Sequence, residues 1–240
     1  MKKPLLLVLT LTGFGLYGFL GLALYPYFLI TGFKEAQVRK FFYMLARGVF
    51  WVVKRAAKSF TLEGAQNIPA GAAVIAANHS SILDILCMAE FGREDIIFIT
   101  RGWPSKVPVM GAYVRAAGNI RLEDTGGSDA ALKAAAASAF RKGLKIIVFP
   151  EGARGPEGVL RRFRSGAFML ALDFKVPLVP VALKGLGGMI PKSGFWVNAT
   201  DIKISALPPV ENFSASADGA PALKMAQYVK TLIAKKLEEK

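Results

Sequence analysis

The sequence predicts an α/β domain with a largely parallel sheet flanked by helices, preceded by hydrophobic N-terminal helices that associate with a membrane. Three observations support this fold class. From about residue 60 onward, short apolar runs rich in β-branched residues alternate with helical segments, the pattern of a mainly parallel sheet. The 240 residues are 53% apolar, which is enough for one substantial core. Residues 4–33 contain no charged side chain, which sets the N-terminus apart from the rest.

The uncharged N-terminal run is long enough to cross or enter a bilayer, because a spanning helix needs about 20 apolar residues. Pro26 lies late in the run, where proline kinks or ends a helix, and Tyr25, Tyr27 and Phe28 resemble an interfacial aromatic belt. The segment therefore either spans the bilayer or dips in and returns. A secretory signal peptide is the alternative, but its apolar core would be only about 7–15 residues long.

Positive charge is concentrated in the first sixty residues, which hold nine basic residues and one acidic residue, a net +8 of the chain's +14. Residues 41–58 mix these cations with aromatic side chains, which predicts an interfacial helix drawn to anionic lipid headgroups. A solvated face or a nucleic-acid patch would carry the same excess. Anionic lipid accounts for it beside an apolar run, so we expect no nucleic-acid partner. We place a membrane-anchoring segment at residues 1–57 and the α/β domain at residues 58–240.

Buried strands of the α/β domain are predicted where short apolar runs are bounded by glycine, proline or polar residues. These runs are 71–77, 96–100, 145–149 and 178–183. Residues 197–207 alternate between apolar and polar side chains, which predicts an additional edge strand. Because strands that alternate with helices form a parallel sheet, the functional site is expected at the carboxyl ends of the strands.

Helices are predicted between the strands, at 81–91, in the stretch after Ser105 and at 128–143. The last of them has Ser128 or Asp129 as its N-cap and Gly143 just past its end. The C-terminal tail predicts a further helix, one face of which packs on the core. That face carries Val229, Leu232, Ile233 and Leu237.

A histidine and an aspartate follow the first predicted strand. His79 is the only histidine of the chain, and imidazole is the side chain best suited to take up and release protons near neutral pH. Asp84 lies five residues later, too far around an ideal helix for a side-by-side pair. If His79 lies in the turn before the helix, Asp84 can reach back to one ring nitrogen and fix the tautomer. A purely structural histidine is the alternative.

A second polar group follows the strand at 145–149. Glu151, Gly152 and Arg154 form a Glu-Gly-x-Arg turn, in which the guanidinium can bind phosphate or carboxylate and glycine permits close backbone approach. A turn closed by a Glu–Arg ion pair is the structural alternative. Three downstream arginines extend the cationic surface, unless they serve only solubility. They are Arg161, Arg162 and Arg164.

Cysteine and histidine usage excludes two classes of site. One cysteine cannot close an intramolecular disulfide, and one cysteine with one histidine cannot supply the ligands of an ordinary zinc site. Cys87 lies among Ile85, Leu86 and Met88 and is predicted to be a core residue. We therefore expect neither a metal scaffold of this kind nor a disulfide framework.

Four motifs, in order over about residues 60 to 190, resemble those of the glycerolipid acyltransferase family of the lysophosphatidic acid (1-acylglycerol-3-phosphate) type. They are NHSSILD, which matches the family's HX4D motif, FPEGARG, FRSGAF and VPLVPVAL. The resemblance implies that the histidine is the general base, that the aspartate orients it, and that the FPEG-x-R segment holds the acceptor's phosphate. Carried over, these roles belong to His79, Asp84, Glu151, Gly152 and Arg154.

Two departures from the family pattern concern the acceptor. The family's G-x-x-x-I-D-R motif aligns with residues 118–124, so Asp124 stands where the arginine is expected and Arg121 lies three residues earlier. An offset of three along a strand reverses the face, so Arg121 is a candidate for acceptor binding but not an obvious substitute. Ala153 and Gly155 replace the hydroxyl residues of an FPEGTRS-type motif. These changes weaken the inference that the acceptor is a phosphomonoester.

The resemblance implies a membrane-associated O-acyltransferase without a cofactor, whose donor is an acyl thioester of acyl carrier protein or coenzyme A. The expected acceptor is lysophosphatidic acid. An acyltransferase for a lyso-ornithine lipid or a lysophospholipid, and a non-catalytic membrane lipid carrier, are the alternatives. Arg154, together with Lys106 or Arg164, would neutralise the acceptor headgroup. The expected location is the cytoplasmic (inner) membrane, with the active site facing the cytoplasm.

Overall fold

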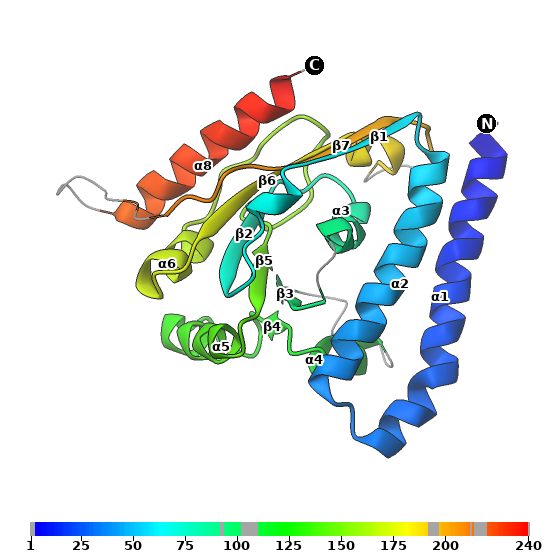
Figure 1. The fold of residues 1–240 in the computed structure, drawn as a ribbon, viewed down its shortest axis with the longest axis horizontal. Coiled ribbons are helices and arrows are strands. Elements are labelled where there is room, and N and C mark those ends of the chain that lie inside the picture. The colour runs from blue at the N-terminus through cyan, green and yellow to red at the C-terminus, as the bar shows by residue number, and fades with distance from the viewer. Residues whose placement is uncertain are drawn as a thin grey trace.

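A computed structural model describes residues 3–91, 94–101, 110–191, 197–211, 213 and 220–239. It contains a seven-stranded sheet with helices on both faces (Figure 1). The strands are β1 (Ser59–Glu63), β2 (Ala73–Ala77), β3 (Ile96–Thr100), β4 (Ile120–Arg121), β5 (Lys145–Val148), β6 (Leu178–Lys184) and β7 (Asp201–Ala206). The α-helices are α1 (Lys3–Thr31), α2 (Glu35–Ala56), α3 (Leu83–Cys87), α4 (Met110–Ala116), α5 (Asp129–Arg141), α6 (Gly166–Asp173), α7 (Leu186–Met189) and α8 (Pro221–Glu238).

The strand order is β1-β7-β6-β2-β5-β3-β4. Among the described strands every neighbouring pair is parallel except β6 with β7, which confirms the prediction of a largely parallel sheet. β2 lies at the centre, where Ala76 pairs with Val148 of β5 and with Pro180 of β6. The carboxyl ends of these three strands therefore meet at one edge of the sheet.

The strand within residues 197–207 is an interior strand, so the prediction of an edge strand there was wrong. β7 lies between β1 and β6, antiparallel to β6, and buries Ile202, Ile204 and Ala206. The edge position is taken by β1, whose residues are too weakly patterned to stand out in the sequence. The alternation that suggested a solvent-facing edge instead separates the buried side chains of β7 from its half-buried Lys203.

Two predicted helices differ in how well they agree with the structure. Helix α5 begins after Ser128, whose hydroxyl accepts a hydrogen bond from the N–H of Ala131, as the capping pattern predicted. The helix predicted at 81–91 is shorter, because α3 ends at Cys87 and a 3-10 turn, Met88–Phe91, continues it. In the stretch after Ser105, residues 102–109 lie outside the described residues, and these include Lys106.

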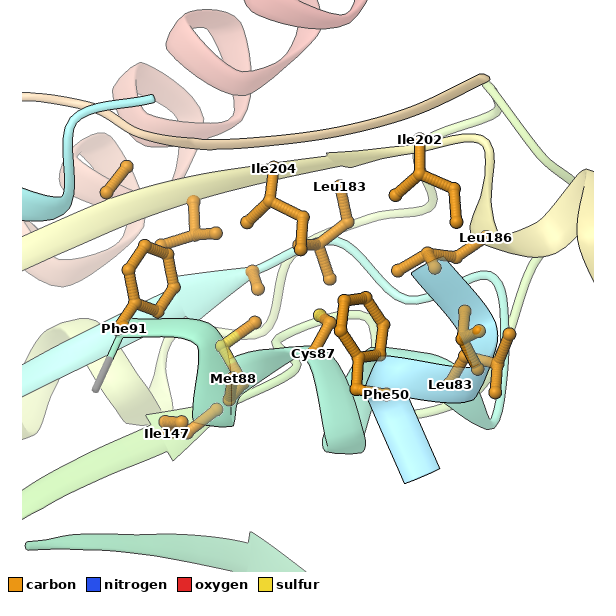
Figure 2. Close-up of a cluster of buried hydrophobic side chains, with 14 of the residues drawn as sticks. Phe50, Leu83, Cys87, Met88, Phe91, Ile147, Leu183, Leu186, Ile202 and Ile204 are labelled. Atoms are coloured by element: carbon orange, nitrogen blue, oxygen red, sulfur yellow. The ribbon is translucent and has the colours of Figure 1, made fainter. Parts of the chain in front are cut away.

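Among the described residues, a hydrophobic layer packs on each face of the sheet. In one layer, α2 and α3 pack against β2, β5, β6 and β7, and Figure 2 shows Phe50 and Cys87 facing the strand residues there. Cys87 is fully buried, which confirms that it is a core residue. In the other layer, α5, α6 and α8 cover the opposite face. Met225, Val229 and Ile233 of α8 are buried there, so the predicted packing of this helix is also confirmed.

The N-terminal helices form an antiparallel hairpin beside the sheet domain (Figure 1). α1 continues through Pro26 and ends at Thr31. An aromatic cluster joins the hairpin to α4, because the ring of Tyr113 lies 5.4 Å from that of Phe28 and its hydroxyl donates to the carbonyl of Gly21 at 2.7 Å. Within the described residues, no helix combines the length and the apolar character needed to cross a bilayer.

The two faces of α2 have different surroundings. Val49, Phe50 and Val53 are buried in the core layer that also contains α3. Met44 and Trp51 are exposed, and the guanidinium of Arg55 lies 4.9 Å above the Trp51 ring. The helix therefore packs on the sheet domain through one face and keeps an aromatic and cationic surface on the other.

Candidate active site

The polar motifs lie at the carboxyl edge of the sheet. His79 follows β2, the Glu151–Arg154 turn follows β5, and Arg121 ends β4. Since β2, β5, β3 and β4 are parallel, all of these segments leave the sheet on the same side. Sites of α/β proteins are found at such edges, because the loops that follow parallel strands converge there.

His79 and Asp84 form a hydrogen-bonded pair. His79 lies in the turn before α3, Asp84 lies in the first turn of α3, and His79 Nδ1 is 2.8 Å from Asp84 Oδ2. This is the backward reach that the sequence predicted. The same carboxylate oxygen accepts the N–H groups of Ser80 and Ser81 at 2.7 and 2.8 Å. With Nδ1 engaged by Asp84, Nε2 is the ring nitrogen that can exchange a proton with a substrate.

The Asp84 carboxyl is fully buried, whereas 15% of the His79 side chain is exposed. Burial raises the pKa of Asp84 above its ordinary value of 3.8, against the hydrogen bonds from His79, Ser81 and Ser80, which lower it. Oδ1 of this carboxyl is buried and has no hydrogen-bond partner among the described residues. The site thus holds an ionisable group away from water and presents its histidine to the surface.

The turn after β5 fixes His79 from the opposite side. The imidazole stacks on the Phe149 ring at 4.2 Å between centroids, with 19° between the planes. The backbone N–H of His79 donates to Glu151 Oε1 at 2.9 Å, and its carbonyl accepts from the N–H of Gly155 at 2.8 Å. The backbone and the ring of His79 are therefore both held by one loop.

Glu151 has a part in this arrangement that the sequence did not predict. Its carboxylate is buried and accepts backbone N–H groups with both oxygens, that of His79 on Oε1 and that of Arg161 on Oε2. The residue thus links the turn after β2 to the loop that precedes α6. Binding of substrate by Glu151 stays a prediction.

The structure brings Gly152 and Arg164 together, a contact that the sequence did not predict. Gly152 has φ of 74°, and a Cβ at this position would lie 3.0 Å from Arg164 Nε. A side chain there would be strained and would collide with the guanidinium group. The N–H of Arg164 also donates to the carbonyl of Pro150 at 2.9 Å. Arg164 is exposed and Arg154 is half-buried, so the turn presents cationic side chains beside the His79 loop.

Arg121 lies farther from the His79–Asp84 pair. β3 separates β4 from β5, so Arg121 leaves the sheet about 10 Å from the β5 turn, given a strand spacing of about 4.8 Å. Its guanidinium forms an ion pair with Asp124, the residue that stands at the family's arginine position. The two charges therefore offset each other on the outer side of the site.

Sequence reasoning missed three polar or aromatic contributions near His79. Phe149 supplies the stacking surface, and Asn78 extends the pairing of β2 with β6 by bonding the N–H and the carbonyl of Leu183 at 2.8 and 2.9 Å. Glu157 accepts a hydrogen bond from the hydroxyl of Ser80. In each of these contacts the two residues are far apart along the chain, so no local sequence pattern predicts them.

Known proteins are similar to this chain over the region that contains the site. The Acyltransferase family profile matches residues 59–184. A chloroplastic 1-acyl-sn-glycerol-3-phosphate acyltransferase of Brassica napus is 30% identical over 154 residues, covering 62% of this chain and 44% of that protein. The human 1-acyl-sn-glycerol-3-phosphate acyltransferase alpha is 28% identical over 152 residues, covering 62% of this chain and 54% of that protein. The chain thus spans about half the length of these curated relatives.

A solved structure has the same fold. The crystal structure of the 1-acyl-sn-glycerophosphate (LPA) acyltransferase PlsC from Thermotoga maritima superposes with a TM-score of 0.72 at 24% sequence identity, covering 99% of this chain and 97% of that one. The likeness extends over both the N-terminal helices and the sheet. Because the family profile covers more than half of the chain, from β1 through β6 and with His79, Asp84 and the Glu151–Arg154 turn inside it, the protein belongs to the Acyltransferase family.

Proposed function

We propose that the protein transfers a fatty acyl chain from an acyl thioester to the free hydroxyl of 1-acylglycerol-3-phosphate, giving phosphatidic acid. The observation that carries this proposal is the 2.8 Å contact between His79 Nδ1 and Asp84 Oδ2, which leaves Nε2 as the ring nitrogen available to a substrate. The names of the relatives from Brassica napus and Homo sapiens support the choice of acceptor.

The acyl group passes directly from the thioester to the acceptor, without an acyl-enzyme. Nε2 of His79 takes the proton of the acceptor hydroxyl while the hydroxyl oxygen attacks the thioester carbonyl. The tetrahedral intermediate then expels the thiolate, which takes the proton back from the imidazolium, so that an ester and a free thiol leave the site. Asp84 stabilises the imidazolium formed between these steps. No covalent enzyme intermediate is needed, and the fully buried Cys87 has no part.

The cationic turn after β5 is suited to the acceptor's phosphate. Arg154 and Arg164 supply planar guanidinium groups, which bind phosphate oxygens in pairs. Gly152 leaves room beside the backbone for the guanidinium of Arg164, through which the turn can reach the headgroup. In this proposal Glu151 acts on the reaction by holding His79, and no metal or redox cofactor takes part. Acyl carrier protein and coenzyme A are both suitable carriers of the donor thioester.

Association with the cytoplasmic membrane is part of the proposal, with the active site on the cytoplasmic side. Large apolar side chains are exposed on the N-terminal hairpin. They are Phe19, Leu22, Leu24, Tyr27, Leu29 and Ile30 on α1, with Met44 and Trp51 on α2. Such side chains beside cations favour contact with anionic lipid. Sedimentation with anionic vesicles tests this part, and loss of binding when residues 1–33 are removed is expected.

A second candidate function is acylation of a lysolipid without a phosphomonoester, such as a lyso-ornithine lipid or a lysophospholipid. The ion pair between Arg121 and Asp124 favours it, because Asp124 offsets the positive charge on the acceptor side. A non-catalytic lipid carrier remains the third outcome.

Purified protein in detergent, supplied with a labelled acyl thioester and a panel of lysolipids, separates the candidate functions. Selective acylation of lysophosphatidate supports the first function, and turnover of an acceptor without a phosphomonoester supports the second. Absence of turnover with any acceptor, or full activity in His79→Ala, contradicts the catalytic proposal.

A further inference from the structure

Glu157 is a charged residue near the active site to which the reaction described above assigns no role. Its Oε1 accepts the N–H of Gly185 at 2.8 Å, and its Oε2 accepts the N–H groups of Gly187 and Gly188 at 2.6 and 3.3 Å. Oε2 also accepts the hydroxyl of Ser80 at 3.2 Å. Four donors thus converge on one carboxylate, and hydrogen bonds to an ionised acceptor are stronger than those between neutral groups.

Ser80 connects this cluster to the catalytic pair. It follows His79 directly, is 4% exposed, and donates its N–H to Asp84 Oδ2 at 2.7 Å. The serine therefore uses its hydroxyl for Glu157 and its backbone for Asp84. A displacement of Ser80 would move the N–H that Asp84 accepts.

Helix α7 packs closely against the turn that contains His79 and Ser80. A Cβ on Gly187 would lie 2.7 Å from Ser80 Cβ and 2.5 Å from Glu157 Oε2, so only glycine fits there. At the other end of α7, the hydroxyl of Ser81 donates to the carbonyl of Ile190 at 3.3 Å. The turn that contains His79 thus packs against α7, and Glu157 is hydrogen-bonded to both.

We propose that Glu157 is a positioning residue of the His79–Asp84 pair, which it controls through Ser80 and the first residues of α7. This inference rests on the proposed acyl transfer. Direct binding of the acceptor by Glu157 is disfavoured, because the four donors occupy its oxygens and its negative charge repels a phosphate. Misplacement of a catalytic group by about 1 Å costs about 100-fold in rate, so Glu157 is expected to govern turnover more than substrate binding.

Kinetics of Glu157→Gln test the first half of this inference. Glutamine keeps the size of the side chain, but it replaces one accepting oxygen with an NH₂ group. That group faces backbone N–H or hydroxyl donors and cannot accept their hydrogen bonds. We expect kcat to decrease about 10- to 100-fold while the KM values for both substrates stay within about twofold. Glu211→Gln, an exposed residue after β7, is the matched control and is expected to behave as wild type. Unchanged kcat in Glu157→Gln, or a loss confined to KM, overturns the inference.

A double-mutant cycle tests the route through Ser80. Ser80→Ala removes the hydroxyl and keeps the backbone N–H that Asp84 accepts. If Glu157 acts through Ser80, the double variant loses no more activity than Glu157→Gln alone, whereas losses that multiply contradict that route.

The single histidine allows a measurement that does not depend on turnover. In protein labelled with nitrogen-15 in histidine, all ring signals come from His79. We expect exchange of the Nδ1 proton with water to become several-fold faster in Glu157→Gln than in wild type and Glu211→Gln. Identical exchange in the three proteins refutes the positioning role. If wild type acylates no acceptor, the proposed function fails, while this comparison still decides the part played by Glu157.

Discussion

The β2–β5 part of the site and the outer, β4 part are built differently. At β2–β5, His79 is held by its ring, by its N–H and by its carbonyl, and Asp84 Oδ2 accepts three donors. At β4, Arg121 ends a two-residue strand and pairs with Asp124, a residue that is 54% exposed. The comparison indicates that the fold holds the proposed base in place, whereas the charged pair proposed for the acceptor side is more exposed.

The largest expected effect comes from removing the base. His79→Ala should lower kcat about 10²- to 10⁴-fold, the usual contribution of a positioned general base. Initial rates with a saturating acyl thioester and acceptor measure it. The variant must still unfold in one cooperative transition, at a lowered melting temperature, because the ring of His79 stacks on Phe149 and bonds the buried Asp84.

Asp84→Asn is expected to lower kcat by up to about 10⁴-fold, because asparagine cannot stabilise the imidazolium and favours the other ring tautomer. At higher pH the same variant is expected to lose less stability than wild type. Because burial raises the pKa of Asp84, the folded protein binds its proton more tightly than the unfolded chain, so wild type loses stability as pH increases from about 3.8 through the raised pKa. Urea unfolding across this range should give a weaker pH dependence for Asp84→Asn. A pH dependence equal to that of wild type argues against a buried, ionising Asp84.

Changes in the cationic turn are expected to affect KM more than kcat. Arg154→Ala should raise the KM for lysophosphatidate about 10-fold, as loss of a charged hydrogen bond does. Arg154→Lys should raise this KM by a smaller factor. Arg141→Ala, on the exposed end of α5, serves as the control. A decrease in kcat without a change in KM would indicate that Arg154 acts on the position of His79 and not on binding of the acceptor.

The smallest effect is expected at the outer strand. Asp124→Ala frees the guanidinium of Arg121, and because the pair is partly exposed, the KM for an anionic lysolipid should decrease by less than about fivefold. The same variant with a zwitterionic lysolipid should show no decrease. An equal response to both acceptors would separate this ion pair from acceptor recognition.

The sequence predicted the parts of the molecule that depend on local pattern. The runs of β2, β5 and β6 were recognisable because buried strands are largely apolar, and α5 because its cap and its periodicity agree. The run of β3 is also apolar, although four of its five residues are only half-buried. The backward reach of Asp84 followed from placing His79 before the helix. These features need only a few neighbouring residues.

The features that the sequence did not predict depend on contacts between distant segments. Nothing near Glu151 indicates that its oxygens bind the N–H groups of His79 and Arg161. The interior place of β7 is likewise set by β1, from the other end of the domain. The division at residues 57 and 58 stays a prediction, although the C-terminal half of α2 contributes Phe50 and Val53 to the core layer that it shares with β7.

The hydrogen bonds from the β5 turn to both sides of the His79 backbone have a consequence for folding. Glu151 is 72 residues from His79 along the chain, and Leu183, which is bonded to Asn78, is 105 residues from its partner. During synthesis the N-terminal part emerges first, so His79 and Asp84 are made long before the segments that hold them. Contacts of such separation form late, because the loop between them must close first. A nascent chain therefore acquires its reactive histidine geometry only when the centre of the sheet is complete.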